Sequence, residues 1–145
     1  MDERLSALAD ALAAVGDRWS PLLVASLLDG PLRFGELQQR VPGIAPNVLA
    51  ARLRSLEGDG LLVATPYSER PPRFAYELTR SGHELAGALR MLTDWGARRG
   101  ADAGEGALRH ELCGTPLQAQ WYCPTCQEPV AGGASGEAPD ELYYA

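Results

Sequence analysis

The sequence predicts a mainly α-helical domain with one small β-hairpin, followed by a short appendix. Three observations lead to this fold class. Apolar residues recur at helical spacing in five segments before residue 100, and Gly or Pro separates most of these segments. Two short strand-like runs flank a proline-rich stretch near residue 70. All three cysteines follow the helical segments.

The first three helices end at glycine or proline. Residues 5–15 carry a stripe of leucines at helical spacing, and a glycine ends this helix. Asp17 can cap a second helix that runs to about residue 28, because its carboxylate can accept hydrogen bonds from the free N–H groups of the first turn. A third, short helix covers about residues 33–41, and a Pro-Gly pair then forms a tight turn.

The fourth helix begins at Pro46, where a missing N–H costs little, and ends at Asp59-Gly60. Two strands are expected next, at residues 61–65 and 73–78, joined by a loop over residues 66–72. Thr79 can cap a fifth helix, which continues to Gly100 and carries the stripe Leu85, Leu89, Leu92 and Trp95.

Three helices with a tight turn between the last two, followed by a β-hairpin, form the layout of a winged helix-turn-helix domain. The fourth helix directs Leu49, Leu53 and Leu56 inward. Its outer face is then small and polar, which suits the major groove, where Asn pairs with adenine and Arg with guanine. The alternative is an ordinary solvated helix face. The candidate groove-reading residues are Asn47, Val48, Ala51, Arg52, Arg54 and Ser55.

Two further places offer groups for the phosphate backbone. Arg70 and Arg73 flank two prolines in the hairpin loop, although a solvated turn would look the same. Arg33 and Gly35, at the start of the third helix, can add a guanidinium and backbone amides.

The charge distribution permits binding to the phosphate backbone. Residues 1–100 hold 12 acidic residues and 12 arginines, and the formal charge of −6 arises from 7 acidic residues and one arginine in residues 101–145.

The chain closely resembles the HxlR-type winged-helix transcription regulators. The resemblance lies in six stretches, in order, within about residues 5–100: GDRW, LLDGPLRFGEL, PGI, LRSLEGDGL, PPRFAY and LTRSG. It implies a homodimer that binds a pseudo-palindromic operator in double-stranded DNA. The dimer would be held by the first and last helices, and two leucine stripes agree with this: Leu5, Leu8 and Leu12, and Leu85, Leu89 and Leu92.

Two departures from the family pattern matter. Family redox sensors carry a cysteine near the N-terminus, whereas this chain has none before Cys113. Ala45 stands where the family often has a serine-like helix cap, which weakens that cap. A small-molecule effector site is expected, if at all, near the dimer helices around Trp19, Leu89, Leu92 and Trp95, although such residues usually belong to the core.

The motif His110-x2-Cys113, nine residues, Cys123-x2-Cys126 has the spacing of a structural Zn²⁺ site and resembles zinc-ribbon knuckles. Three thiolates and one imidazole would close a tetrahedral site with no open position for catalysis. Incidental thiols or a redox Cys123/Cys126 pair are the alternatives. The expected domains are residues 1–100, a linker at 101–106, a zinc-binding appendix at 107–130 and an acidic flexible tail at 131–145.

Taken together, these patterns indicate a sequence-specific DNA-binding transcription regulator, repressor or activator, and not an enzyme. A winged helix that binds protein partners is the first alternative, because net neutrality over residues 1–100 is unusual for a DNA-binding domain. A thioredoxin-like enzyme would need a βαβ unit before the C-x2-C motif, and none is present. The chain lacks a long apolar run and a secretory signal, so we expect a cytoplasmic protein without membrane contact.

Overall fold

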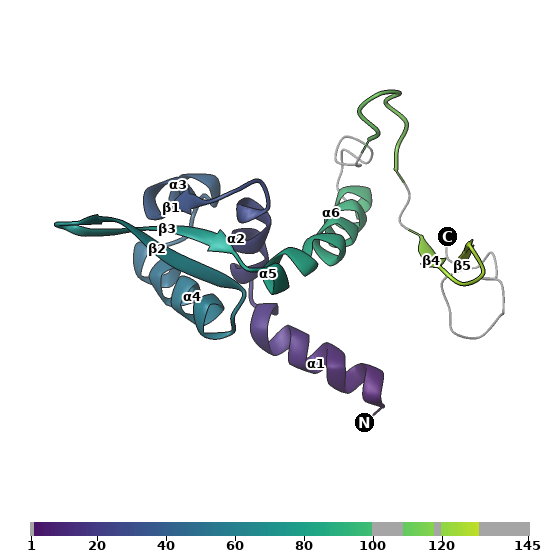
Figure 1. The fold of residues 1–145 in the computed structure, drawn as a ribbon, viewed down its shortest axis with the longest axis horizontal. Coiled ribbons are helices and arrows are strands. Elements are labelled where there is room, and N and C mark those ends of the chain that lie inside the picture. The colour runs from purple at the N-terminus through teal and green to yellow at the C-terminus, as the bar shows by residue number, and fades with distance from the viewer. Residues whose placement is uncertain (1, 100–108, 118–119, 131–145) are drawn as a thin grey trace. The chain divides into compact units, whose positions relative to one another are not determined.

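The computed structural model describes residues 2–99, 109–117 and 120–130, which form parts of two compact units, Met1–Leu92 and Thr93–Ala145. The first unit contains the predicted winged helix-turn-helix (Figure 1). The predicted linker, residues 101–106, and the predicted tail, residues 131–145, lie outside the described residues.

The first unit begins with two helices, both expected from the sequence. Helix α1 spans Glu3–Val15, and the Asp2 carboxylate accepts a hydrogen bond from the backbone N–H of Arg4. Helix α2 spans Ser20–Leu27. It begins three residues after Asp17, whose carboxylate accepts hydrogen bonds from the backbone N–H groups of Trp19 (2.8 Å) and Ser20 (3.2 Å) and from the Ser20 hydroxyl. The N-cap residue of α2 is Trp19 and not Asp17, the residue that the sequence predicts, and Trp19 makes no side-chain cap hydrogen bond. Asp17 still satisfies backbone N–H groups at the start of the helix from two residues further upstream.

The helix-turn-helix follows as α3, Phe34–Arg40, and α4, Pro46–Gly58. Arg33 is the N-cap residue of α3, at the start that the sequence predicts for this helix. It also belongs to a short strand that was not expected, β1 (Leu32–Arg33), in which it lies opposite Ala75. Two-residue strands leave no periodicity for sequence analysis to detect. The turn before α4 contains Gly43 with φ of +87°, a backbone conformation that suits glycine, and the buried Ile44 anchors it.

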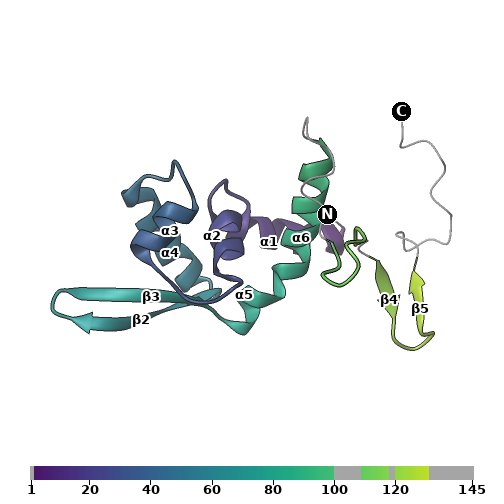
Figure 2. The same ribbon diagram turned by 90° about the horizontal axis from the view of Figure 1, so that it is seen from above.

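The wing is longer than the sequence predicts. Strands β2 (Leu62–Glu69) and β3 (Pro72–Leu78) pair antiparallel, and the sheet order is β1-β3-β2. The expected loop over residues 66–72 shrinks to Arg70-Pro71. Pro66 fits because β2 is an edge strand, and the register shifts between Pro66 and Ser68, which leaves Tyr67 as the extra residue of a bulge. Figures 1 and 2 both show the wing projecting beyond α3 and α4.

The expected fifth helix is two helices, α5 (Arg80–Glu84) and α6 (Ala86–Arg99). Thr79 caps α5 as predicted, since its hydroxyl accepts a hydrogen bond from Gly82 N–H at 3.2 Å. The helical hydrogen-bond pattern changes at Leu85, whose N–H bonds to the Gly82 carbonyl three residues earlier. The Leu85 side chain packs against the core.

One leucine-rich core holds the first unit together. Leu23, Val24 and Leu27 of α2 share this core with the inner leucines of α4 and with residues of the wing strands. Fully buried side chains such as these each contribute about 1.5–3 kcal/mol of hydrophobic stabilisation. The buried apolar residues are Leu23, Val24, Leu27, Leu37, Val41, Ile44, Leu49, Leu53, Leu56, Leu61, Leu62, Leu78 and Leu89.

Gly82 fixes how closely α5 approaches the start of the wing. A Cβ at Gly82 would lie 2.1 Å from the Leu61 carbonyl oxygen, and that oxygen also accepts a hydrogen bond from the Thr79 N–H at 3.0 Å. The backbone at Gly82 and the backbone at Leu61 cannot move apart without breaking the hydrogen bond from Thr79 to Leu61. Helix α5 can therefore pack here only with glycine at this position.

We predict that Gly82→Ala lowers the free energy of unfolding by more than about 2 kcal/mol, because it overpacks a backbone contact. Gly87→Ala is the matched control, since a Cβ there meets nothing within 4 Å. This second variant should be neutral or more stable by about 0.5–1 kcal/mol. Urea unfolding followed by circular dichroism measures both, and equal effects would contradict the close approach.

Candidate nucleic-acid interface

The outer face of α4 is largely as the sequence predicts. Asn47, Ala51, Arg54 and Ser55 are exposed, whereas the inner leucines are buried. The N-cap residue Ala45 makes no side-chain hydrogen bond, in agreement with the weak cap expected there. Val48 differs from the prediction, since it is half-buried and packs against the core. An exposed polar strip thus runs along α4.

Arg52 is not part of this exposed strip. Its Nε lies 3.4 Å from Oδ1 of Asp17, and this Nε is buried without a hydrogen bond to any other described residue. The ion pair joins α4 to the segment that precedes α2. The sequence did not indicate Asp17 as the partner of Arg52, because the two residues are distant in sequence and adjacent only in the fold. The Arg52 side chain is 42% exposed, and its contact with DNA stays a prediction.

Asp17 itself is held as a carboxylate. Burial raises its pKa, but hydrogen bonds from the Ser20 hydroxyl and the backbone N–H groups of Trp19 and Ser20, together with the charge of Arg52, outweigh burial. The pKa of Asp17 therefore lies below its ordinary value. The group combines a helix cap and an interhelical ion pair in one side chain.

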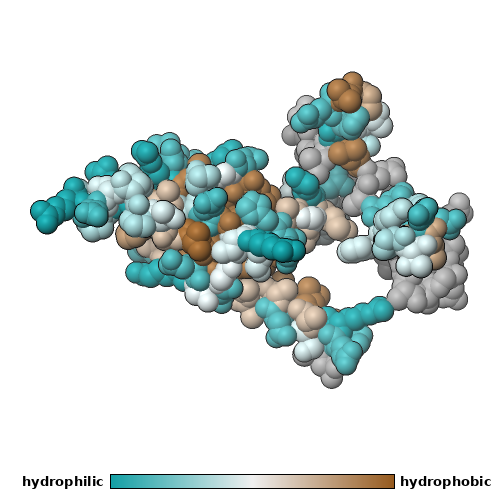
Figure 3. Space-filling model, in the orientation of Figure 1, coloured by the Kyte–Doolittle hydropathy of each residue, from teal (hydrophilic) through white to brown (hydrophobic). Residues whose placement is uncertain are grey.

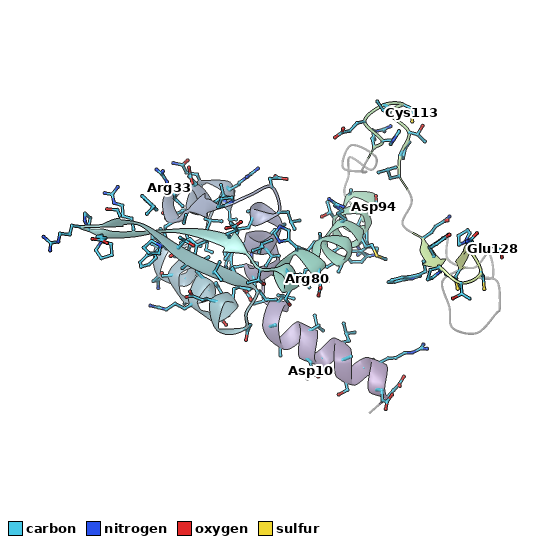
Figure 4. The ribbon with its side chains drawn as sticks, viewed as in Figure 1. Asp10, Arg33, Arg80, Asp94, Cys113 and Glu128 are labelled. Carbon is cyan, nitrogen blue, oxygen red and sulfur yellow. The ribbon has the colours of Figure 1, made fainter. Side chains whose placement is uncertain are left out.

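A hollow of about 610 Å³ lies between the start of α3 and the wing. Arg33, Gly35 and Arg73, all predicted to contact phosphates, line it and are exposed. Arg70 is exposed at the wing tip, which Figure 3 shows as hydrophilic. The structure thus brings Arg33 and Gly35 of one segment to the same surface as Arg73 of the wing, and Figure 4 shows Arg33 beside α3.

Tyr67 completes this surface and was missed by sequence analysis. The Arg33 guanidinium carbon lies 4.5 Å from the centroid of the Tyr67 ring, a cation–π contact worth about 0.5–1 kcal/mol at exposed sites. The Arg33 backbone N–H also donates a hydrogen bond of 2.7 Å to the Glu36 carboxylate. Both contacts hold Arg33 in place. The feature of the sequence that could have indicated Tyr67 is its position as an aromatic residue inside the proline-rich stretch.

Tyr76 lines the same hollow and also lies near two charged residues of α4, Glu57 and Arg54. Burial, and then the nearby Glu57 carboxylate, raise the pKa of Tyr76, while Arg54 opposes this effect. Its hydroxyl therefore keeps its proton at neutral pH. A protonated phenol can donate a hydrogen bond to an acceptor such as a phosphate oxygen.

The leucines of the predicted dimer surface differ in burial. Leu5, Leu8 and Leu12 are 53–55% exposed, and none of the α1 residues is buried. Leu92 is also exposed. Leu89 instead belongs to the core, and Leu85 packs against it, so the prediction was wrong for Leu89. The break at Leu85 turns this part of the stripe inward.

The residues of the expected effector site are not gathered in either of the two hollows described for the first unit. Trp19 lines a hollow of about 390 Å³ with Arg18, Leu22, Ala25, Ser26, Arg40, Val41 and Pro42, whereas Leu89 and Leu92 do not line it. Trp95, which is exposed, belongs to the second unit. Leu89 is excluded because it is buried in the core.

The second unit contains the predicted metal ligands in two turns. His110 Nδ1 and Cys113 Sγ lie 3.3 Å apart in the first turn, where Figure 4 labels Cys113. Cys123 and Cys126 lie in the second turn, between strands β4 (Trp121–Cys123) and β5 (Glu128–Val130). Among the described residues, no group of three or more metal-binding side chains is gathered at one point. Each turn thus holds two of the four predicted ligands, but the two turns do not bring all four side chains together.

A helix-turn-helix with an exposed second helix, packed beside a wing that carries arginines, defines a winged-helix DNA-binding domain. The family model described as HxlR-like helix-turn-helix matches residues 14–103. The chain belongs to this family. It is a DNA-binding transcription regulator, as its relatives and structural neighbours are named.

The relatives cover much of the chain. An uncharacterized HTH-type transcriptional regulator of Mycobacterium tuberculosis is 37% identical over 123 residues, covering 83% of this chain and 77% of the relative. One from Methanothermobacter thermautotrophicus is 38% identical over 100 residues, covering 69% and 76%. The solved structure of PA1607, a putative transcription factor, has a TM-score of 0.72 and 33% identity, covering 92% of this chain and 94% of that one. The redox regulator HypR in its reduced form has a TM-score of 0.60 and 31% identity, covering 63% and 92%.

In the part of the chain that the structure describes, no helix combines the length and apolar character needed to cross a membrane.

We predict that Asp17→Ala lowers the free energy of unfolding at pH 7 by about 0.5–2 kcal/mol, because it removes a helix cap. The folded pKa of Asp17 is depressed, so its stabilisation is present above the unfolded pKa of about 3.9 and is lost as pH falls through the folded pKa. The wild-type and variant curves should therefore converge below about pH 4. Asp10→Ala on the exposed face of α1 is the control and should stay within about 0.5 kcal/mol of wild type.

Proposed function

We propose that the protein binds a specific pseudo-palindromic operator as a homodimer, with α4 in the major groove and the wing on the phosphate backbone. The observation that carries this proposal is the outer face of α4, which is exposed and free of acidic residues from Asn47 to Ser55. No catalytic group is required for this activity.

Side-chain chemistry assigns different tasks to the residues of α4. Asn47 can pair with adenine and Arg54 with guanine through two hydrogen bonds each, which is the basis of direct readout in the major groove. Ala51 lies one turn from both and has a small side chain, which lets the helix approach the base edges closely. Ser55 can hydrogen-bond to any base. Val48 and Arg52 are left out because one packs against the core and the other pairs with Asp17.

The wing and the start of α3 supply contacts that position the protein without reading sequence. Arg33 and Arg73 line one hollow, and Arg70 lies at the tip of the wing. Because Tyr67 stacks on Arg33, the Arg33 side chain is already partly ordered. It therefore loses less conformational entropy when it binds a phosphate. Arginines at these three places give local positive charge to a unit whose overall charge is balanced.

The homodimer is supported by the exposed leucines of α1. A helix of 13 residues with no buried side chain is marginal on its own in water, and Leu5, Leu8 and Leu12 form one apolar stripe along it. A second copy of the chain offers the same stripe by two-fold symmetry. Packing the two stripes together removes them from water and places two α4 helices on one side of the duplex.

We predict that Arg54→Ala and Asn47→Ala each cost about 1–3 kcal/mol of operator binding and relax the preference at one base pair. Arg70→Ala and Arg73→Ala should weaken operator and random DNA alike and lower the salt slope by about one. Fluorescence anisotropy with operator and scrambled duplexes, at several salt concentrations, separates the two classes. Equal losses on both duplexes for Arg54→Ala would refute the groove assignment.

We also predict that Leu8→Glu converts the dimer into a monomer, because it places a charge in the apolar stripe of α1. Ala7→Glu, exposed on the other side of α1, carries the same charge change and should remain dimeric. Light scattering measures the mass of each, and footprinting should show half-sites about 34–36 Å apart for the dimeric proteins. A monomeric wild-type protein with one asymmetric footprint would overturn the proposal.

A further inference from the structure

The two turns of the second unit share one backbone geometry. In the first, Gly114 N–H donates a hydrogen bond of 2.8 Å to the His110 carbonyl, and in the second, Gln127 N–H donates one of 2.8 Å to the Cys123 carbonyl. The donor residue of each bond has a positive φ, +68° at Gly114 and +58° at Gln127. The two segments therefore form the same five-residue turn.

This turn places two metal-binding side chains together. In each case the candidate ligands occupy the first and fourth positions, and the residue with positive φ follows the fourth. The 3.3 Å contact between His110 and Cys113 shows that the two side chains of the first turn converge. Residues other than glycine seldom adopt a positive φ, so the positive φ of Gln127 is a specific feature that the second turn shares with the first. Two different sequences thus adopt one conformation suited to holding a pair of ligands.

Each turn is stabilised by contacts that do not involve the ligands' metal-binding atoms. The Arg109 guanidinium donates a hydrogen bond of 2.9 Å to the Gly114 carbonyl, and Arg109 forms a bridge with Pro116 across the first turn. In the second turn, Cys123 pairs with Glu128 at the end of the β4–β5 hairpin. Both turns therefore close small hairpins, and each turn holds one pair of candidate ligands.

We propose that one Zn²⁺ joins these two half-sites, bound by His110, Cys113, Cys123 and Cys126. Three sulfur ligands and one imidazole nitrogen match the tetrahedral donor set of structural zinc. The nine residues between Cys113 and Cys123 are ample to bring the turns together, and closing so short a loop costs little entropy. All four positions are filled by the protein, so the ion is structural.

Surface composition explains what the ion adds. Leu112, Trp121 and Tyr122 are exposed in the described structure, at 90%, 67% and 62%. So few apolar side chains cannot form a self-sustaining core for two short hairpins. Coordination supplies the missing stabilisation and lets the two hairpins cover one another's apolar side chains. The winged-helix unit has its own core and does not depend on the ion.

The first test measures metal content of the full chain purified under reducing conditions without chelator. We expect one zinc per chain, and Co²⁺ in its place should give the absorption bands of a tetrahedral thiolate site. Cys113→Ser and Cys123→Ser, one from each half-site, should each weaken zinc binding at least about 100-fold. Thr125→Ser, between the two ligands of the second turn, is the control and should retain one equivalent.

The second test addresses the turn geometry. Gln127→Gly should bind Zn²⁺ at least as tightly as wild type, whereas Gly114→Val should bind it several-fold more weakly, because valine resists a positive φ. Operator affinity and helical circular dichroism should stay unchanged in all these variants, so this proposal can fail without affecting the DNA-binding proposal. Absence of zinc, retention of zinc by Cys113→Ser, or a Cys123–Cys126 disulfide in the freshly prepared protein would overturn it.

Discussion

The burial of Leu49, Leu53 and Leu56 determines how α4 presents its opposite face. These three leucines occupy one side of the helix, are at most 2% exposed and belong to the hydrophobic core. Rotation of α4 about its axis would expose them, at a cost of about 1.5–3 kcal/mol for each side chain. The direction of Asn47 and Arg54 is therefore fixed by residues that never touch DNA, and the ion pair of Arg52 with Asp17 strengthens the same orientation.

The sequence was a good guide wherever a single helix face was decisive. Periodic leucines and terminal Gly or Pro residues located α1, α2 and α4 to within a few residues, because these signals are local. The errors arose where distant segments meet. The ion pair of Arg52 was not foreseen because its partner Asp17 lies 35 positions away. The burial of Val48 and Leu89 was not foreseen because it depends on neighbouring elements. β1 is too short to show a pattern, and the bulge at Tyr67 disguised a strand as a loop.

The charge distribution explains how a neutral domain can belong to a family of DNA-binding regulators. Exposed Arg33, Arg70 and Arg73 gather at the wing, while Arg40 pairs with Asp29 and Arg80 with Glu84 elsewhere on the domain. Charges neutralised in pairs contribute little to the field at a distance. The acidic excess lies after residue 100, and residues 1–100 carry no formal net charge, with 12 acidic residues and 12 arginines.

The absence of buried residues in α1 links its stability to the amount of protein present. Within its own chain, α1 packs against the core through Ala14 and Val15 at its C-terminal end. In the proposed homodimer the rest of the helix gains its packing from the second copy, so the stability of that part changes with the logarithm of protomer concentration. At low concentration α1 frays while the leucine core of the winged helix stays intact. Occupancy of a two-fold operator would then rise more steeply than linearly with expression level, which gives the regulator a concentration threshold without any small-molecule ligand.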